Sequence, residues 1–176
     1  MIKGNKISLR YINSSELEEL INLINNVDLK GDFVRSLMKS PIELKNEFAL
    51  NGLSSESSET LAIVDKSDQL IGIIAHFKTV HYSTARELGF SVFDHNDRNK
   101  GFAQEAVQLL TTYLFQSRPI NRIQICMVVG HEASEKVAIS SGYIKEGIIR
   151  GMIFIRGRYL DGYMYAMLRS DFEKST

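Results

Sequence analysis

Several residue types are scarce in this sequence, and each shortage excludes a class of protein. The chain has 176 residues but only one cysteine, Cys126, so it holds no internal disulfide framework and no multi-cysteine zinc site. With only two prolines, the chain has no proline-rich linker. The amino terminus lacks the apolar stretch of a signal peptide, and no apolar run reaches the ~18 residues that span a membrane. We therefore expect a protein of the reducing cytoplasm that has no membrane partner.

An excess of either charge is also missing. The chain carries 21 basic and 21 acidic residues, whereas a protein that holds nucleic acid through its phosphates needs a basic face. We expect no nucleic-acid partner, although a local basic pocket is compatible with this balance. Hydrophobic residues make up 44% of the chain, which is enough for a core. With no repeat or linker to divide it, the length predicts one domain over residues 1–176.

Apolar periodicity predicts the order of strands and helices. Strands are expected over residues 6–12, 60–65, 70–80, 85–93, 122–129, 143–154 and 159–168. Helices are expected over residues 15–24, 28–38, 103–114 and 133–141, and a further helix is expected to start at residue 41. Strands that meet first through hairpins and later through a crossover helix predict a mixed sheet with helices packed on it, an α/β (α+β) fold.

Specific residues mark the ends of these helices. Ser15 and Glu18 have the spacing of a capping box. Ser40 followed by Pro41 predicts a helix start, because serine is a favoured cap and proline suits the first helical position. Gly142 predicts the end of the helix over residues 133–141, because glycine adopts the left-handed conformation at low cost.

One segment combines the features of an anion-binding site. A buried strand ends near Phe93, a polar loop with Arg98 and Lys100 follows, and a helix begins at Gly101. The first turn of a helix presents free backbone N–H groups and the positive end of the helix dipole. Gly101 lets a phosphate approach the backbone, and the small Ala103 does the same further along. The segment indicates a phosphate-bearing ligand, and the alternative is a solvated loop at an ordinary helix start.

The same segment resembles a known family motif. Residues 98–103, Arg-Asn-Lys-Gly-Phe-Ala, match the Arg/Gln-x-x-Gly-x-Gly/Ala motif of the GNAT superfamily of N-acetyltransferases. Further similarity follows in the family's order at residues 87–90, 134–150 and 157–161. The chain is most similar to the branch that includes the ribosomal-protein alanine N-acetyltransferases. The resemblance implies a mostly antiparallel sheet of six to seven strands, with splayed central strands and helices on both faces.

The resemblance also implies a reaction and a co-substrate. Members transfer an acetyl group from acetyl-CoA to a primary amine, here a protein amino terminus or a small molecule, by direct attack in a ternary complex. No metal takes part, and the enzyme is expected to be a monomer or a homodimer. The backbone of the strand end would bind the pantetheine arm, and the loop would bind the pyrophosphate. The implied cofactor-binding residues are Ser91, Val92, Phe93, Arg98, Asn99, Lys100, Gly101, Phe102, Ala103, His131 and Ser134.

The resemblance implies Glu87 as the general base, acting directly or through water, because the family often places a glutamate at this end of the strand. A base is needed to remove a proton from the attacking amine. Glu146 on a neighbouring strand is the alternative, and His95 and His131 titrate nearest to neutral pH. Ser134 would donate a hydrogen bond to the sulfur of coenzyme A. The alternatives without a function are a surface carboxylate for Glu87 and an ordinary capping or first-turn serine for Ser134.

Two positions depart from the family's pattern. His131 stands where an asparagine usually orders the loop beside the pantetheine arm, and Ala138 stands where many relatives have a tyrosine acid. These departures keep open a second hypothesis, a non-catalytic acyl-CoA-binding or interaction module with the same fold. Tyr143 stands where relatives have phenylalanine, and we expect it in the core.

Two further groups of residues have both a functional and an ordinary interpretation. Cys126 has the chemistry for a covalent acetyl intermediate, but a free cysteine within a strand is usually a small buried apolar residue. Glu43, Glu47, Glu56 and Glu59 would form the acidic pocket that a polyamine acceptor requires, or else a solvated face. We favour the ordinary interpretation for both groups.

Overall fold

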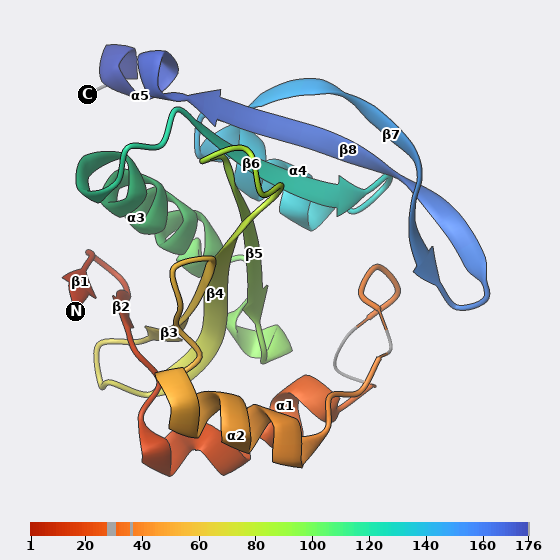
Figure 1. Cartoon of the computed structure of the whole chain (residues 1–176). Helices are drawn as coiled ribbons and strands as arrows, with labels where there is room; N and C mark the ends of the chain where they lie inside the picture. Colours follow the sequence, from red (N-terminus) through yellow and green to blue (C-terminus); the bar gives the residue numbers. More distant parts are fainter. Residues whose placement is uncertain (28–30, 36, 176) are drawn as a thin grey trace.

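One sheet of eight strands runs through the part of the chain that the structure describes. The computed structural model describes residues 1–27, 31–35 and 37–175. The strands are β1 (Ile2–Lys3), β2 (Ser8–Arg10), β3 (Ser58–Val64), β4 (Leu70–Lys78), β5 (Arg86–Val92), β6 (Arg122–Val128), β7 (Ile144–Ile155) and β8 (Arg158–Leu168). Their order in the sheet is β1-β2-β3-β4-β5-β6-β8-β7, and only β5 and β6 are parallel (Figure 1). The predicted mixed, mostly antiparallel sheet is confirmed, with eight strands in place of six to seven.

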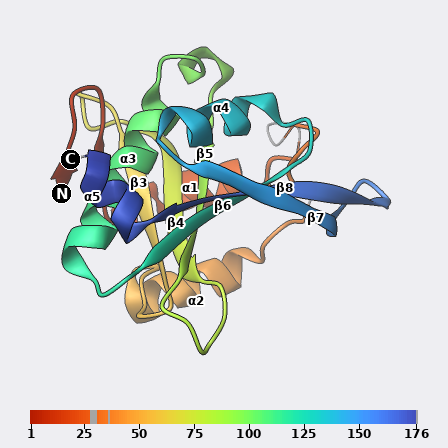
Figure 2. The same ribbon diagram turned by 90° about the horizontal axis from the view of Figure 1, so that it is seen from above.

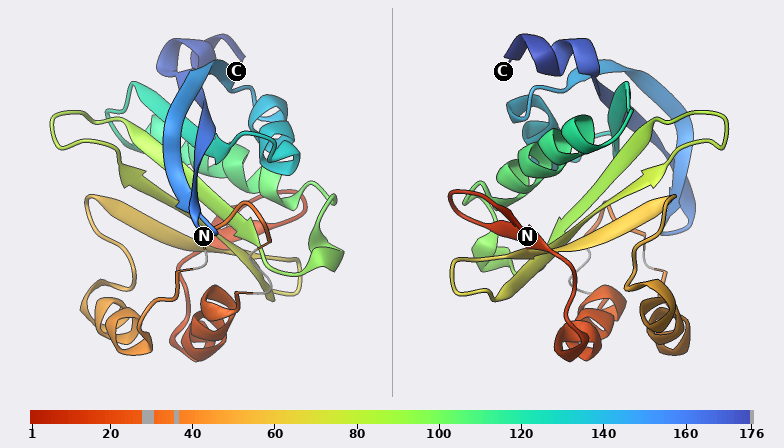
Figure 3. Two further views of the ribbon diagram at one scale, coloured as in Figure 1. Left: turned by 90° about the vertical axis from the view of Figure 1, so that its right-hand side faces the viewer. Right: turned by 60° about the vertical axis from the view of Figure 1, so that its left-hand side comes forward.

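Helices pack on both faces of this sheet, as expected. They are α1 (Leu17–Asn25), α2 (Pro41–Asn51), α3 (Phe102–Ser117), α4 (Glu132–Ser140) and α5 (Arg169–Ser175), with short 3-10 turns η1 (Ser14–Glu16) and η3 (His95–Asp97). Leu61 and Ile63 of β3 belong to the core beneath α3, whereas Ala62 and Val64 belong to the core beneath α1 and α2. Successive strand residues point to opposite faces, so β3 contributes to both cores. Figure 3 shows α3 on one side of the sheet and α1 and α2 on the other.

β5 and β6 are hydrogen-bonded neighbours at one end only. Two parallel pairs join them, Arg86 with Ile123 and Glu87 with Gln124. Beyond these pairs β5 follows β4 as far as Val92, and β6 follows β8 as far as Val128. The two strands therefore diverge in the middle of the sheet, which confirms the predicted splay. One edge of each strand is left without a strand partner along the divergence.

The helix ends follow two of the three sequence signals. Ser40 caps α2 and Pro41 is its first residue, and Gly142 follows α4 with a φ of 85°. The predicted capping box of Ser15 and Glu18 is wrong. The carboxylate of Glu16 instead accepts a hydrogen bond from the Asn13 N–H at 2.8 Å, because Arg10 holds this carboxylate beside the start of η1.

Three further elements differ from the sequence prediction. In the segment predicted as a helix over residues 28–38, residues 28–30 and 36 lie outside the described part, and residues 31–35 and 37–38 are not helical. β1 is too short to show a periodic pattern and exists through its pairing with β2. The final helix, α5, was not predicted because long-range contacts fix it. The ring of Phe172 packs 5.1 Å from that of Phe115 on α3.

Candidate functional site

Glu87 lies where β5 and β6 begin to diverge. It is half-buried, and its Oε2 accepts a hydrogen bond from the side-chain amide of Gln124, its partner on β6, at 2.8 Å. Gln124 and Cys126 are two positions apart on β6, so their side chains point to the same face of the sheet, which is also the face of Glu87. The structure therefore places a carboxylate at the closed end of the divergence, in contact with the neutral side-chain amide of Gln124.

A pocket of about 570 Å³ opens beside Glu87. Its walls come from β5, β6, two residues between α1 and α2, and the β7–β8 hairpin. Figure 2 shows this hairpin projecting beyond the rest of the sheet. The residues that line it are Arg35, Leu37, Glu87, Cys126, Met152, Ile153, Phe154, Ile155 and Arg156. Its size suits a small molecule or the end of a peptide.

Glu146, the alternative base, is held in an ion pair. Both of its carboxylate oxygens accept hydrogen bonds from the Arg122 guanidinium, at 2.7 and 2.5 Å. This contact with Arg122 lowers the pKa of Glu146 from its usual range. A carboxylate with a lowered pKa and both oxygens engaged is a poor acceptor for the proton of an amine, so the geometry favours Glu87.

Cys126 lies beside Glu87 as a neutral thiol. Burial, and then the nearby Glu87 carboxylate, raise the pKa of this thiol to about 12. The thiolate is the nucleophilic form of cysteine, and almost none of it is present at neutral pH when the pKa is this high. The residue is half-buried in the pocket wall, next to the carboxylate that disfavours its ionisation.

Every second residue of β5 turns its backbone N–H and C=O groups toward the gap between β5 and β6. The N–H of Phe93 donates to the carbonyl of Ile71 on the β4 side, at 3.0 Å. Alternation in the antiparallel ladder places the backbone groups of Ser91 on that side too, and turns those of Val92 and Phe90 toward the opening. Of the three predicted strand residues, Val92 is therefore the one with free backbone groups in the divergence, and Phe90 is a residue that the sequence analysis missed.

The predicted anion-binding loop connects β5 to α3. After η3 the chain passes through Arg98, Asn99 and Lys100, and Gly101 directly precedes the first helical residue. Gly101 has a φ of 82°, a conformation that L-residues rarely adopt. The N–H groups of the first turn, which includes Phe102 and Ala103, are free of intrahelical partners, as at any helix start. The loop thus places a left-handed glycine directly before the free N–H groups of a helix start.

The charges around this loop differ from the simple sequence expectation. The ammonium of Lys100 is paired with Asp97 at 2.9 Å. A third cation, Lys6, comes from the turn between β1 and β2. Its ammonium donates to the carbonyl of Lys100 at 2.9 Å and lies 3.0 Å from where a Cβ on Gly101 would be. No local sequence signal points to Lys6, because 94 residues separate it from Lys100 in the chain.

A known family accounts for this arrangement. The family model described as "Acetyltransferase (GNAT) domain" matches residues 9–164, which is most of the chain. The chain belongs to this family. The predicted resemblance is confirmed, and the protein is an acetyl-CoA-dependent N-acetyltransferase.

The proteins similar to this GNAT chain include acetyltransferases that are named for different acceptors. An uncharacterized N-acetyltransferase, p20 from Bacillus licheniformis, is 29% identical and covers 93% of this chain and 86% of its own length. The spermidine N-acetyltransferase from Vibrio cholerae, solved with CoA and spermine, has a TM-score of 0.81 at 20% identity over 95% of this chain and 98% of that one. The ribosomal L7/L12 alpha-N-protein acetyltransferase RimL, solved with coenzyme A, has a TM-score of 0.82 at 20% identity, over 95% and 97%.

The positions that differ from the GNAT pattern have structural explanations. Ala138 is fully buried on the inner face of α4, where a tyrosine would not fit without rearrangement. Tyr143 is buried in the core as expected, and its hydroxyl lies 2.6 Å from that of Thr111. His131 is half-buried at the N-cap of α4, with the ring of Phe33 packed edge-on at 4.8 Å. Burial, and then the charge of Arg98, lower its pKa, so it is neutral at physiological pH.

The other residues singled out in the sequence lie in α4, in η3 or away from the pocket. Ser134 lies in the first turn of α4, which is one of its two ordinary interpretations, and the N-cap is His131. His95 is exposed in η3 and does not line the pocket beside Glu87. None of the four acidic residues considered for a polyamine pocket lines it either. They are Glu43, Glu47, Glu56 and Glu59.

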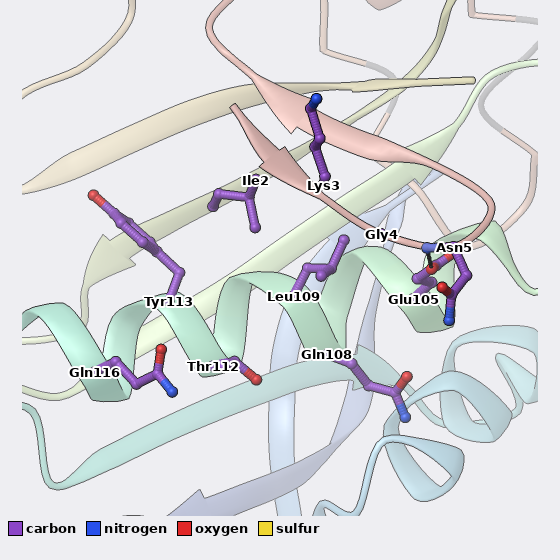
Figure 4. Close-up of a pocket in the computed structure, with 10 residues that line it drawn as sticks. All are labelled: Ile2, Lys3, Gly4, Asn5, Glu105, Gln108, Leu109, Thr112, Tyr113 and Gln116. Atoms are coloured by element: carbon purple, nitrogen blue, oxygen red, sulfur yellow. Dashed lines mark hydrogen bonds between the residues drawn. The ribbon is translucent and has the colours of Figure 1, made fainter. Parts of the chain in front are cut away.

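A second hollow of about 480 Å³ lies between β1 and the outer side of α3 (Figure 4). The carboxylate of Glu105 accepts backbone hydrogen bonds there from Asn5 and Lys6, which attaches the amino-terminal turn to α3. Within the described ranges, no group of three or more His, Cys, Asp or Glu residues is placed to hold a metal ion. Every described helix falls short of the length or apolar character that crossing a bilayer requires.

Proposed function

We propose that this chain holds acetyl-CoA across the divergence of β5 and β6 and transfers the acetyl group directly to a primary amine in the adjacent pocket. The observation that carries the proposal is the two-residue pairing of these strands. Because the pairing stops after two residues, the sheet is open between the anion-binding loop and Glu87. One domain, formed by residues 1–176, contains the complete site.

The pyrophosphate of the co-substrate would lie at the start of α3. There the backbone N–H groups that follow Gly101 meet the cations of Arg98, Lys100 and Lys6. The pantetheine arm would then follow the open edge of β5, where the backbone of Val92 and Phe90 is available. His131 and Ser134 face the same ligand from the start of α4. Ser91, Phe93, Asn99, Phe102 and Ala103 shape the loop and strand that carry these contacts.

In the proposed reaction acetyl-CoA supplies an acetyl thioester, and Glu87 accepts the proton that the ammonium form of the acceptor must lose. The neutral amine nitrogen forms a bond to the thioester carbon, and the carbon–sulfur bond breaks. The second proton that the nitrogen loses passes to the departing thiolate, so the products are the acetylated amine and free CoA. A backbone N–H of β5 would stabilise the oxyanion that develops between these two events. Ser134 would donate a hydrogen bond to the departing sulfur. Cys126 has no role in this sequence, because its thiol stays protonated.

The acceptor would enter through the pocket beside Glu87, which is open to a protein amino terminus as well as to a small amine. Both kinds occur among the structural relatives, as spermine in one and a ribosomal protein in another. We further propose that the enzyme acts in the cytoplasm as a monomer or homodimer, with neither nucleic acid nor membrane as partner. A free thiol at Cys126 agrees with a reducing compartment.

Thermal unfolding with acetyl-CoA tests the binding half of the proposal. Ligand at a hundred times its Kd stabilises the folded state by about 2.7 kcal/mol, which raises the Tm of a domain of this size by roughly 5–10 °C. Gly101→Glu should abolish this rise, because the new carboxylate would occupy the anion site beside Lys6. Gly157→Glu is the matched control. Gly157 has a similar φ of 84° and lies at the β7–β8 turn, with open space around it, so it should keep the rise.

Release of free CoA on adding amines tests the catalytic half. Wild-type protein that binds acetyl-CoA and releases CoA only when an amine is present supports direct transfer. Protein that binds acetyl-CoA but turns over no amine would support the non-catalytic alternative. An unchanged Tm with acetyl-CoA, in folded protein free of bound coenzyme, would remove the assignment of the loop.

A further inference from the structure

The pocket beside Glu87 carries opposite charges at two separate places. Glu87 is the one carboxylate among the described residues that line it, and it lies at the junction of β5 and β6. Arg35 and Arg156 also line the pocket, from the α1–α2 segment and the β7–β8 turn. The lining between them is apolar apart from the thiol, as in Leu37 and Ile153. The pocket is thus negative at one place and positive at another, with an apolar middle.

Both arginines are available to a ligand. Arg35 is exposed, and no described residue forms an ion pair or hydrogen bond with its guanidinium. Arg156 is paired with Asp32 at 2.6 Å, but the two side chains are 56% and 76% exposed. An ion pair this exposed contributes little stability, so an incoming anion competes with Asp32 at small cost.

The pocket lacks what a polycation would need. Glu59 is buried on the opposite face of the sheet, and Glu56 is paired with Lys78 away from the pocket. Glu43 and Glu47 are exposed on α2 and do not line the pocket either. A diamine with its first nitrogen at Glu87 would carry its second positive charge toward Arg35 or Arg156, where like charges repel.

We propose that this enzyme selects acceptors that carry an anionic group close to the primary amine, and that Arg35 is the residue that selects them. The inference rests on the proposed role of Glu87 at the amine. An amine at Glu87, an apolar body against Ile153 and Phe154, and an anion at Arg35 match the lining in charge and polarity. Arg35 takes no part in the chemical step, so its effect is on the choice of acceptor.

Matched acceptors test the proposal. Three peptide amides with a free amino terminus would differ only at the second residue, which is glutamate, glutamine or lysine, and spermidine and free glutamate would complete the set. We expect kcat/KM for the glutamate peptide to exceed that for the lysine peptide by up to about fivefold at low salt, the range of exposed charge pairs. Turnover of free glutamate would show that a small molecule suffices. Turnover of the peptide alone would show that a longer chain is required.

Variants of Arg35 make the test specific. Arg35→Gln should remove the preference between the two charged peptides, and Arg35→Glu should reverse it. Arg158→Gln is the matched control, because Arg158 is exposed on the same hairpin as Arg156 and does not line the pocket. It should keep the wild-type ratio. Raising the salt concentration should reduce the ratio in the wild type, because exposed charges are screened.

The outcomes separate this proposal from the proposed function. Equal use of the charged peptides, a preference for spermidine, or an unchanged ratio in Arg35→Glu would overturn the selection of anionic acceptors while leaving the acetyltransferase site in place. If no acceptor is turned over, calorimetric binding of the peptides to the CoA-saturated protein decides. Tighter binding of the glutamate peptide supports the proposal, and equal or absent binding overturns it. Failure to bind acetyl-CoA would instead count against the proposed function.

Discussion

Two glutamates on neighbouring parts of the sheet, Glu59 and Glu87, show how one residue type serves two purposes. Glu59 pairs in register with His76, and His76 pairs with Leu88. Glu87, one position before Leu88, therefore points to the other face. Glu59 is 3% exposed beneath the end of α3, whereas Glu87 is half-buried and lines an open pocket.

The partners of the two carboxylates differ as much as their burial does. Glu59 accepts hydrogen bonds from the Tyr11 hydroxyl at 2.8 Å and from the Ser54 hydroxyl at 3.3 Å. A ring nitrogen of His76 lies 3.0 Å away. These contacts, led by His76, lower its pKa to about 2. Glu87 has one neutral amide donor, Gln124. A carboxylate surrounded by donors is fixed as an anion, whereas the Glu87 carboxylate faces an open pocket.

Glu87→Gln should have the largest effect on transfer. It removes the proton acceptor but keeps the shape of the side chain, so we expect kcat to fall by about 10²–10⁴-fold. Affinity for acetyl-CoA should change little, because the anion-binding loop is unaltered. Steady-state kinetics and thermal unfolding with acetyl-CoA measure the two effects. If the variant keeps wild-type rates across the pH range, bulk water and not Glu87 accepts the proton.

Glu59→Gln should have the opposite pattern. The free energy of unfolding should fall by about 1.5–3 kcal/mol, the range for a hydrogen bond to a charged group, because Tyr11 and His76 lose their carboxylate partner. Urea unfolding measures this loss. The kcat of the folded variant should stay near that of the wild type, since Glu59 lies on the face away from the pocket. A large fall in kcat with stability intact would contradict the division between the two glutamates.

The acid stability of the wild type should depend on Glu59. Its pKa is lower in the folded state than the ordinary value of 4.5, so the folded state gains stability from its ionised form. That contribution is complete above about pH 4.5 and is lost as the pH falls toward about 2. Unfolding free energies measured through this range should fall more steeply in the wild type than in Glu59→Gln. Parallel curves would show that other carboxylates determine the pH dependence of the unfolding free energy.

Cys126→Ala should have the smallest effect. The thiol lies beside Glu87 but stays protonated, so transfer should remain within about threefold of wild type, compared with the thousands-fold loss expected when a covalent nucleophile is removed. Steady-state kinetics with one acceptor suffice. Loss of transfer in a variant that still binds acetyl-CoA would bring back a covalent route through Cys126.

The two regions also differ in how far the sequence predicts them. Glu87 and the loop from Arg98 to Ala103 lie in one continuous stretch with a family motif, so their positions follow from local sequence and resemblance. Glu59 was grouped with a possible acidic pocket, because its burial depends on pairing with His76 on the next strand. Lys6 was missed for the same reason, since a contact across 94 residues leaves no mark on the local pattern.

Local signals also failed at the helix ends that depend on distant partners. Pro41 and Gly142 act through their own backbone, and both predictions are confirmed. The start of η1 is set by Arg10 holding Glu16, and α5 by Phe172 against Phe115, and neither contact shows in periodicity. Chemistry carried by one segment is therefore predictable here, whereas chemistry assembled between segments requires the fold.

The two-residue pairing of β5 and β6 has a consequence for the folded chain as a whole. Without a ligand, the hydrogen-bonded ladder from β1 to β5 is joined to the ladder of β6, β8 and β7 through those two pairs alone among the described strands. A pantetheine arm with its own amides would act there as a substitute strand, and the two ladders would become one cooperative unit. Amide hydrogen exchange should then slow on both sides of the opening when acetyl-CoA binds, including at β8 residues that never touch it.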